Sequence, residues 1–156
     1  MNNFKKPFHL GVYYTPLLLV MFFVTCTQGP RNYATMQQID KKGWQPLHSY
    51  SCEIVLNDSL SFFYVDITGR FARYLPDSLS LIVEVTSPLG SSFCDTLSFA
   101  ITHIPNRFWT DFRFPYCSHV RFSEKGVWRF SFRHHMNAET LIGIEAIGVY
   151  IKRESS

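Results

Sequence analysis

Cys26 is the residue whose position points most directly to chemistry. It closes a hydrophobic stretch, residues 17–24, which follows a basic pair, Lys5 and Lys6. Basic, apolar and small residues in this order are typical of a secretory signal peptide. A cysteine at the first position after cleavage presents a thiol that can accept lipid. We therefore predict a lipoprotein signal peptide over residues 1–25 and lipid attachment at Cys26.

Two other interpretations of this N-terminus remain open: a signal peptide that is simply cleaved, and a single membrane helix. Phe23 and Thr25 stand where a bacterial lipobox usually has leucine and a small residue. A spanning helix, however, needs about 20 apolar residues. The apolar stretch 10–25 is shorter and contains Pro16. We expect an exported chain that is anchored to a membrane.

The three other cysteines, Cys52, Cys94 and Cys117, leave their chemistry open. An oxidising compartment would allow one disulfide among them, with three alternative pairings. Their spacing matches no zinc-binding pattern. Buried free thiols that pack as small apolar groups are the simpler interpretation.

Few residues suggest catalysis. His134 and His135 are adjacent, and neighbours on a strand point to opposite faces, so they are poorly placed to bind one metal. Cys117 and His119 would share a face as a Cys–His dyad, but nothing else in the sequence supports an activated thiolate. The carboxylates are scattered, and no phosphate-binding loop or nucleophile elbow is present. We expect no catalytic residues, no metal and no cofactor.

Aromatic residues offer an alternative function. Such residues make up 17% of the chain, and exposed rings on a β-sandwich can stack on sugars. Trp44, Trp109, Tyr116 and Tyr150 are candidates for such a platform, although aromatic residues more often belong to the core or its rim. We take Trp109 and Tyr150 as the candidate ligand-facing residues.

The elements that must position these residues are strands. Residues alternate between apolar and polar in segments 79–85, 127–133 and 144–152, which is the pattern of half-buried antiparallel strands. Segment 60–68 is apolar on both faces, which favours a central strand. Further strands are expected over residues 50–55, 93–101, 108–114 and 119–122.

The spacing of these strands predicts the fold. Turn residues separate them, as in Ser87-Pro88-Leu89-Gly90. About seven or eight strands without a long helical pattern predict an all-β fold, a single antiparallel β-sandwich of jelly-roll type.

The domain organisation follows from the same patterns. We expect a lipidated tether over residues 26–43, with a short helical turn around residues 36–39, and the β-sandwich over residues 44–156. Removal of Lys5 and Lys6 with the leader lowers the net charge from +3 to +1. No basic stripe remains, so we expect no nucleic-acid partner.

The order and spacing of several segments resemble those of the GldH family of gliding-motility lipoproteins of the Bacteroidetes. They share a strand-turn-strand pattern that follows a leader ending in cysteine. The matching segments are Cys26 with its leader, residues 74–85, residues 88–90 leading into 95–99, residues 126–136, and residues 141–149.

The resemblance implies a non-enzymatic envelope lipoprotein. Its partners would be the membrane, through the lipid on Cys26, and other envelope proteins of the gliding and secretion machinery. Acidic residues, a surface-export signature in this phylum, are missing from residues 27–32. We therefore expect the domain to face the periplasm. The alternative is a lipid-tethered module that binds carbohydrate.

Overall fold

The computed structural model of the chain describes residues 32–72, 77–101 and 108–154. These residues form eight β-strands and no helix. The strands are β1 (Asn32–Gln38), β2 (Tyr50–Leu56), β3 (Phe63–Ala72), β4 (Ser78–Thr86), β5 (Ser92–Ala100), β6 (Trp109–Val120), β7 (Gly126–His134) and β8 (Ile144–Arg153).

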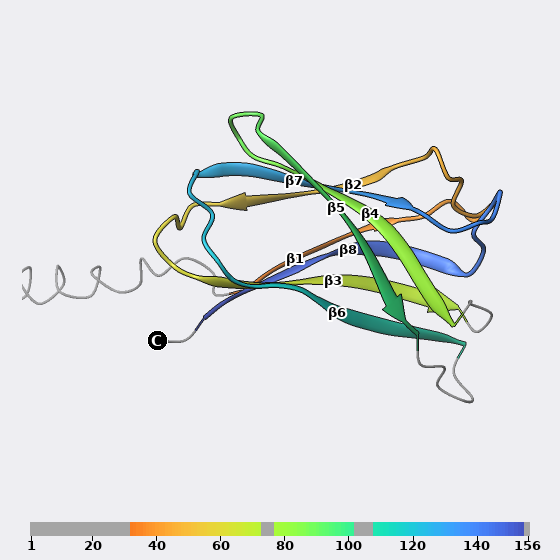
Figure 1. Cartoon of the computed structure of the whole chain (residues 1–156). Helices are drawn as coiled ribbons and strands as arrows, with labels where there is room; N and C mark the ends of the chain where they lie inside the picture. Colours follow the sequence, from red (N-terminus) through yellow and green to blue (C-terminus); the bar gives the residue numbers. More distant parts are fainter. Residues whose placement is uncertain (1–31, 73–76, 102–107, 155–156) are drawn as a thin grey trace, which may run out of the picture.

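The strands pair into two antiparallel sheets that pack face to face (Figure 1). One sheet has the order β1-β8-β3-β6, and the other has the order β2-β7-β4-β5. Consecutive strands therefore cross repeatedly from one sheet to the other, which is the topology of a jelly roll. The predicted all-β, jelly-roll-like sandwich is confirmed.

The alternating pattern explains how each sheet buries one face. In β4, Leu79, Leu81 and Val83 are fully buried, whereas Glu84 is exposed. The predicted inward row of β8 (Ile147, Val149, Ile151) is also fully buried. Large apolar side chains from both sheets thus form a single core. Burial of this surface is the main source of stability in such a fold.

The structure confirms a central strand near residues 60–68 but moves its bounds. β3 begins at Phe63 and lies between β8 and β6. The two strands expected over residues 108–114 and 119–122 are one strand, β6, of 12 residues. Pro115 lies within it. A proline is tolerated there because β6 is an edge strand, on which one side of the backbone has no partner.

The tether predicted over residues 26–43 is wrong for its second half, and so is the helical turn at residues 36–39. Residues Asn32–Gln38 form β1, which pairs with β8 along its whole length. The sandwich thus begins at Asn32 and not at Trp44. β1 escaped detection because it is an edge strand with only half-buried residues, such as Tyr33 and Thr35, on its inner face.

Candidate functional site

One side of the sandwich is closed and the other is open. On the closed side, edge strands β1 and β2 lie close together, and the Cys52 thiol contacts the Thr35 hydroxyl. On the open side, edge strands β5 and β6 converge towards one end of the sandwich (Figure 1). There Phe99 stacks on Phe114, with ring centroids 4.3 Å apart. Towards the start of β5 a cleft of about 390 Å³ opens between the two sheets.

The cleft is lined mainly by apolar side chains. Phe93, on β5, is paired with half-buried Val85 and yet is 58% exposed. β5 is the edge strand of its sheet, and within the described ranges no further strand pairs with its free side, where this ring is exposed. Among the described residues of the lining, Arg121 and Glu124 are the charged ones. The principal apolar and aromatic residues of the lining are Val65, Val85, Phe93, Tyr116, Phe122 and Trp128.

A β-bulge places two consecutive residues of β6 in this cleft. Val65 pairs with Cys117 and Asp66 pairs with Pro115, so Tyr116 is an extra residue on β6. Bulges re-aim side chains in this way. Tyr116 and Cys117 consequently both line the cleft.

Tyr116 brings a polar group into these apolar surroundings. Its Oη is buried and has no hydrogen-bond partner among the described residues. Burial, followed by the nearby Cys117, Asp95 and Cys94, raises the pKa of Tyr116. The phenol is therefore neutral and keeps both a donor and an acceptor. A buried polar group without a partner is costly, so a ligand that pairs with this hydroxyl would be favoured.

Asp95 lies on the inner face of β5, and its charge is one of the causes that raise the pKa of Tyr116. It pairs with Val83, which is fully buried, so both side chains point between the sheets. The Asp95 Oδ1 accepts a hydrogen bond from the Thr96 amide (2.8 Å). No described cation forms an ion pair with Asp95. The open side thus combines an apolar cleft with an unpaired carboxylate.

The adjacent residues His134 and His135 point to opposite sides, as expected for neighbours along an extended chain. His134 is buried, and its ring lies 5.7 Å from that of Trp44. Burial lowers the pKa of His134, so the neutral ring is favoured. His135 points the other way and is exposed. In the described ranges, no group of three His, Cys, Asp or Glu side chains is placed to hold a metal.

Cys117 and His119 do not form the dyad that was considered. His119 has a φ of 57°, which breaks the alternation of β6. Its ring stacks on Phe62 at 3.8 Å, and its Nδ1 lies 3.0 Å from the Glu154 carboxylate. Cys117 instead faces the cleft, where burial raises the pKa of its thiol. The geometry therefore does not produce an activated thiolate.

Trp109 and Tyr150 lie on the outer face of the same sheet but do not form one platform. Tyr150 pairs with Asp66, and Trp109 pairs with Ala72, six positions further along β3. At about 3.3 Å per residue, the two rings are roughly 20 Å apart. Trp109 is 58% exposed. The Arg113 guanidinium covers the Tyr150 ring, 3.7 Å from its centroid.

The two other aromatic candidates belong to the interior. Trp44 is fully buried, and its indole Nε1 donates to the His48 carbonyl (2.8 Å). Tyr116 is half-buried in the cleft. Sequence reasoning placed Tyr116 among exposed rings because it could not foresee the bulge.

The cysteines of the described residues are all free. Cys52 is buried, Cys94 is exposed and Cys117 is half-buried. The interpretation as buried free thiols is thus confirmed for Cys52 and in part for Cys117, and it is wrong for Cys94, which is free but exposed. Cys26 and its leader lie outside the described residues, so lipid attachment stays a prediction. Within those residues, no helix is long and apolar enough to cross a bilayer.

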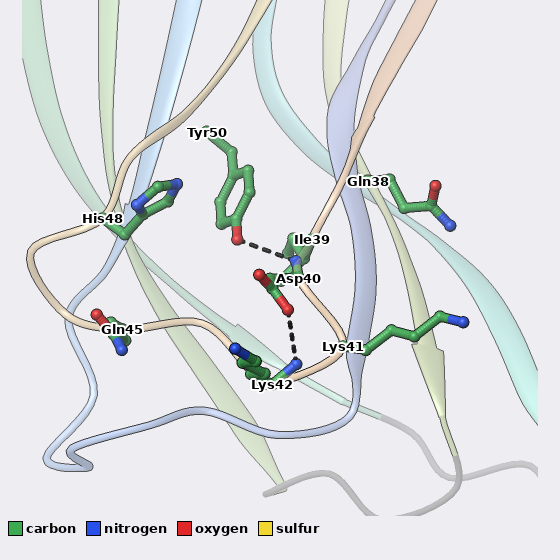
Figure 2. Close-up of a pocket in the computed structure, with 9 residues that line it drawn as sticks. Gln38, Ile39, Asp40, Lys41, Lys42, Gln45, His48 and Tyr50 are labelled. Atoms are coloured by element: carbon green, nitrogen blue, oxygen red, sulfur yellow. Dashed lines mark hydrogen bonds between the residues drawn. The ribbon is translucent and has the colours of Figure 1, made fainter.

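A second hollow lies beside the loop that joins β1 to β2 (Figure 2). It measures about 520 Å³ and is more polar than the cleft. The Tyr50 hydroxyl accepts a hydrogen bond from the Asp40 amide (3.0 Å), and the Asp40 Oδ1 accepts one from the Lys42 amide (2.9 Å). The His48 ring lies 4.7 Å from the Tyr50 ring. Rings beside amides and charges are groups that can bind sugars.

The fold and its open side define a jelly-roll sandwich with an accessible apolar cleft between two edge strands. Residues 31–151 match the model of the GldH lipoprotein family, so the chain belongs to this family. It is therefore an envelope lipoprotein of the gliding-motility type, and the resemblance seen in the sequence is confirmed. Membership also supports a membrane-anchored location in the envelope.

Other comparisons add little. The chain is similar to a solved structure of the Tobacco streak virus coat protein, with 8% identity over 85% of this chain and 90% of that chain. The TM-score is 0.30, which is too low to support any argument. No curated protein matches the chain.

Proposed function

We propose that this chain is a lipid-anchored envelope protein that docks onto other proteins of the gliding and secretion machinery and catalyses no reaction. The observation that carries the proposal is the open side of the sandwich, where the cleft exposes Phe93. Exposed aromatic residues around an apolar hollow are typical of protein-binding surfaces. Family membership supports the setting in the envelope.

The anchor decides where the open side acts. A lipid on Cys26 would hold the sandwich near the bilayer, because β1 begins only six residues later, at Asn32. The domain would face the periplasm, since acidic residues that direct surface export are missing after Cys26. Docking partners would then be other periplasm-facing proteins. A short tether of this kind limits the reach of the domain to partners close to the membrane.

Photo-cross-linking in cells tests the docking function. A photoreactive phenylalanine replaces Phe93 in the cleft or, as a control, Val55 on β2. These two side chains are 58% and 55% exposed, so they are matched in accessibility. We expect position 93 to give a discrete product with one envelope protein and position 55 to give none. The same products at both positions, or none at either, would contradict docking through the open side.

The polar hollow favours one alternative, a lipid-tethered carbohydrate-binding module. His48 and Tyr50 offer rings, and Gln38 and Gln45 offer amides. The separation of Trp109 from Tyr150 argues against the larger platform considered from the sequence. A binding assay with soluble peptidoglycan fragments distinguishes the two functions. Binding that is lost in His48→Ala would favour the sugar module, whereas no binding would leave docking as the better account.

A further inference from the structure

The free edge of β5 is a long and regular stretch of unpaired backbone in the described part of the molecule. β5 pairs with β4 over nine residues, Ser92–Ala100, without a register shift. Among the residues that the structure describes, no strand pairs with its other side (Figure 1). A free edge of this kind presents a row of amides and carbonyls that another strand can pair with.

The other edge strands are protected along their backbone, whereas β5 carries a single inward-pointing charge, Asp95. β6 is interrupted by Pro115, by the bulge at Tyr116 and by the positive φ of His119. β1 and β2 lie close to each other on the closed side of the sandwich. β5 has no lysine, arginine, proline or bulge, and Asp95 is its only charged residue. Proteins usually protect long edge strands with such features, and also with inward-pointing charges such as Asp95, so the β5 edge should accept only a strand that neutralises this carboxylate.

The amide of Thr96 shows which backbone groups face the free edge. Main-chain amides of a strand alternate between its two sides. The Thr96 amide donates to the Asp95 carboxylate, whereas an amide directed at β4 would donate to a carbonyl of that strand. The Thr96 amide therefore points to the free edge. Asp95 occupies this donor in the unbound protein, and an incoming strand would take the donor over while its basic side chain pairs with the released carboxylate.

We infer that β5 accepts an extended segment of another polypeptide as an added strand, with a basic side chain opposite Asp95 and apolar side chains on either side of it. This inference rests on the proposed docking function and specifies its partner. Strand addition is an established mode of peptide recognition, in which main-chain hydrogen bonds supply affinity and alternate side chains supply specificity.

The chemistry of the partner follows from the inner face of β5. Phe93, Asp95 and Leu97 alternate along that face. A strand paired with β5 would set its own alternate side chains beside these three. Apolar side chains would cover Phe93 and Leu97, and a lysine or arginine would pair with the carboxylate. Opposite charges directly across two strands are favourable, whereas like charges are unfavourable.

The test uses the full-length lipoprotein in detergent and a fluorescent nonapeptide, Val-Thr-Val-Thr-Arg-Thr-Val-Thr-Val. Its arginine shares one face with the valines. A second peptide carries glutamate in place of the arginine. Binding is measured by fluorescence anisotropy. We expect the arginine peptide to bind the wild type about two- to fivefold more tightly than the glutamate peptide, and Asp95→Lys to reverse this preference.

Thr96→Pro tests whether the backbone edge is used. Proline removes a free-edge donor and places its ring in the path of the incoming strand, while the bonds to β4 are retained. We expect binding of the arginine peptide to weaken about tenfold or more. Thr96→Val is the matched control, because it keeps the amide and should keep the affinity. Circular dichroism checks that both variants fold, and if Thr96→Pro does not fold, the charge reversal decides alone.

Three outcomes would overturn the inference: no binding by either peptide, equal binding by Thr96→Pro and Thr96→Val, or no charge preference. A wild-type dimer that Thr96→Pro dissociates in light scattering would also overturn it, because a second copy would then occupy β5. If Phe93 still cross-links to an envelope protein, docking stands and strand addition alone is wrong. If that cross-link also fails, the docking function itself is wrong.

Discussion

Phe99 and Phe114 stack with their ring centroids 4.3 Å apart and an angle of 19° between the ring planes. Phe99 comes from edge strand β5 of one sheet, and Phe114 comes from edge strand β6 of the other. Phe114 also lies parallel to Phe112, at 5.9 Å. This pair therefore joins the two sheets at one end of the open side and defines where the cleft begins.

A double-mutant cycle measures this contact. Phe99→Ala, Phe114→Ala and the double variant should show a coupling free energy of about 0.5–1.5 kcal/mol, the range for aromatic pairs. Denaturant unfolding of the wild type and the three variants supplies the four free energies of unfolding. Phe108→Ala is the control, because this ring is 79% exposed, and we expect a change within about 0.5 kcal/mol. Strictly additive effects of Phe99→Ala and Phe114→Ala would show that the rings do not join the sheets.

Gly148→Ala tests whether β1 belongs to the sandwich. Gly148 pairs with Met36 of β1, and an added Cβ would overlap the Thr35 carbonyl oxygen and the Met36 backbone. Overpacking of this kind costs about 1–3 kcal/mol. We expect a lower free energy of unfolding and loss of amide protection in β1. Lys152→Ala, an exposed change on the same strand, should have little effect. Unchanged protection in Gly148→Ala would mean that β1 is not docked.

The pair Arg70–Asp111 predicts a pH effect on the outer face. A hydrogen bond from Arg70, at 2.7 Å, and its charge lower the pKa of Asp111. A carboxyl whose pKa is lower in the folded than in the unfolded state stabilises the fold above its unfolded pKa. That stability is lost as pH falls through the folded value. Arg70→Gln should therefore be less stable than the wild type at neutral pH, and it should lose less stability than the wild type as pH falls through the acid range.

NMR titration of the side-chain carboxyl carbons checks this directly. In Arg70→Gln the pKa of Asp111 should rise towards the usual value of about 3.9. Asp58 is the internal control, because hydrogen bonds from Ser61 lower its pKa and do not involve Arg70. An Asp111 titration that is the same in wild type and Arg70→Gln would show that the pair does not form in solution.

The free thiols should react in the order of their exposure. Cys94 is exposed, so N-ethylmaleimide should modify it first. Cys117 is half-buried, and burial and Asp95 raise the pKa of its thiol, so its reaction should be slower. Cys52 is buried, and its pKa is also raised by burial. It should react only after unfolding. Mass spectrometry of peptides at timed intervals measures the order, and fast modification of Cys52 in the native protein would contradict the fold.

Much of the fold could be predicted from the sequence because inner strands carry the strongest alternation. β4, β7 and β8 each lie between two other strands of their sheet. Nearly every inward-facing position of these strands is therefore apolar. Edge strands carry a weaker signal. β1 reads as a polar tether because only half of its inner face is covered, and β6 reads as two strands because Pro115 and a bulge interrupt its period.

The candidate site was harder to predict, since it depends on which strands become edges. Nothing local in residues 92–100 indicates that β5 has no second neighbour. The bulge that turns Tyr116 inward depends on the pairing of β6 with β3. One signal was available, namely the low charge of residues 92–100, but a buried strand has the same composition. Aromatic content alone therefore placed the candidate rings at Trp109 and Tyr150 instead of at the cleft.

The most direct test of the central claim, a jelly-roll domain held at the membrane by lipid on Cys26, is intact mass combined with membrane fractionation. Wild type and Cys26→Ala are compared after expression in a host that processes lipoproteins. We expect the wild type to be membrane-bound, to begin at Cys26 and to carry added lipid mass, whereas Cys26→Ala carries none and leaves the membrane fraction. Two soluble forms, or two forms that both keep residues 1–25, would contradict the lipid anchor.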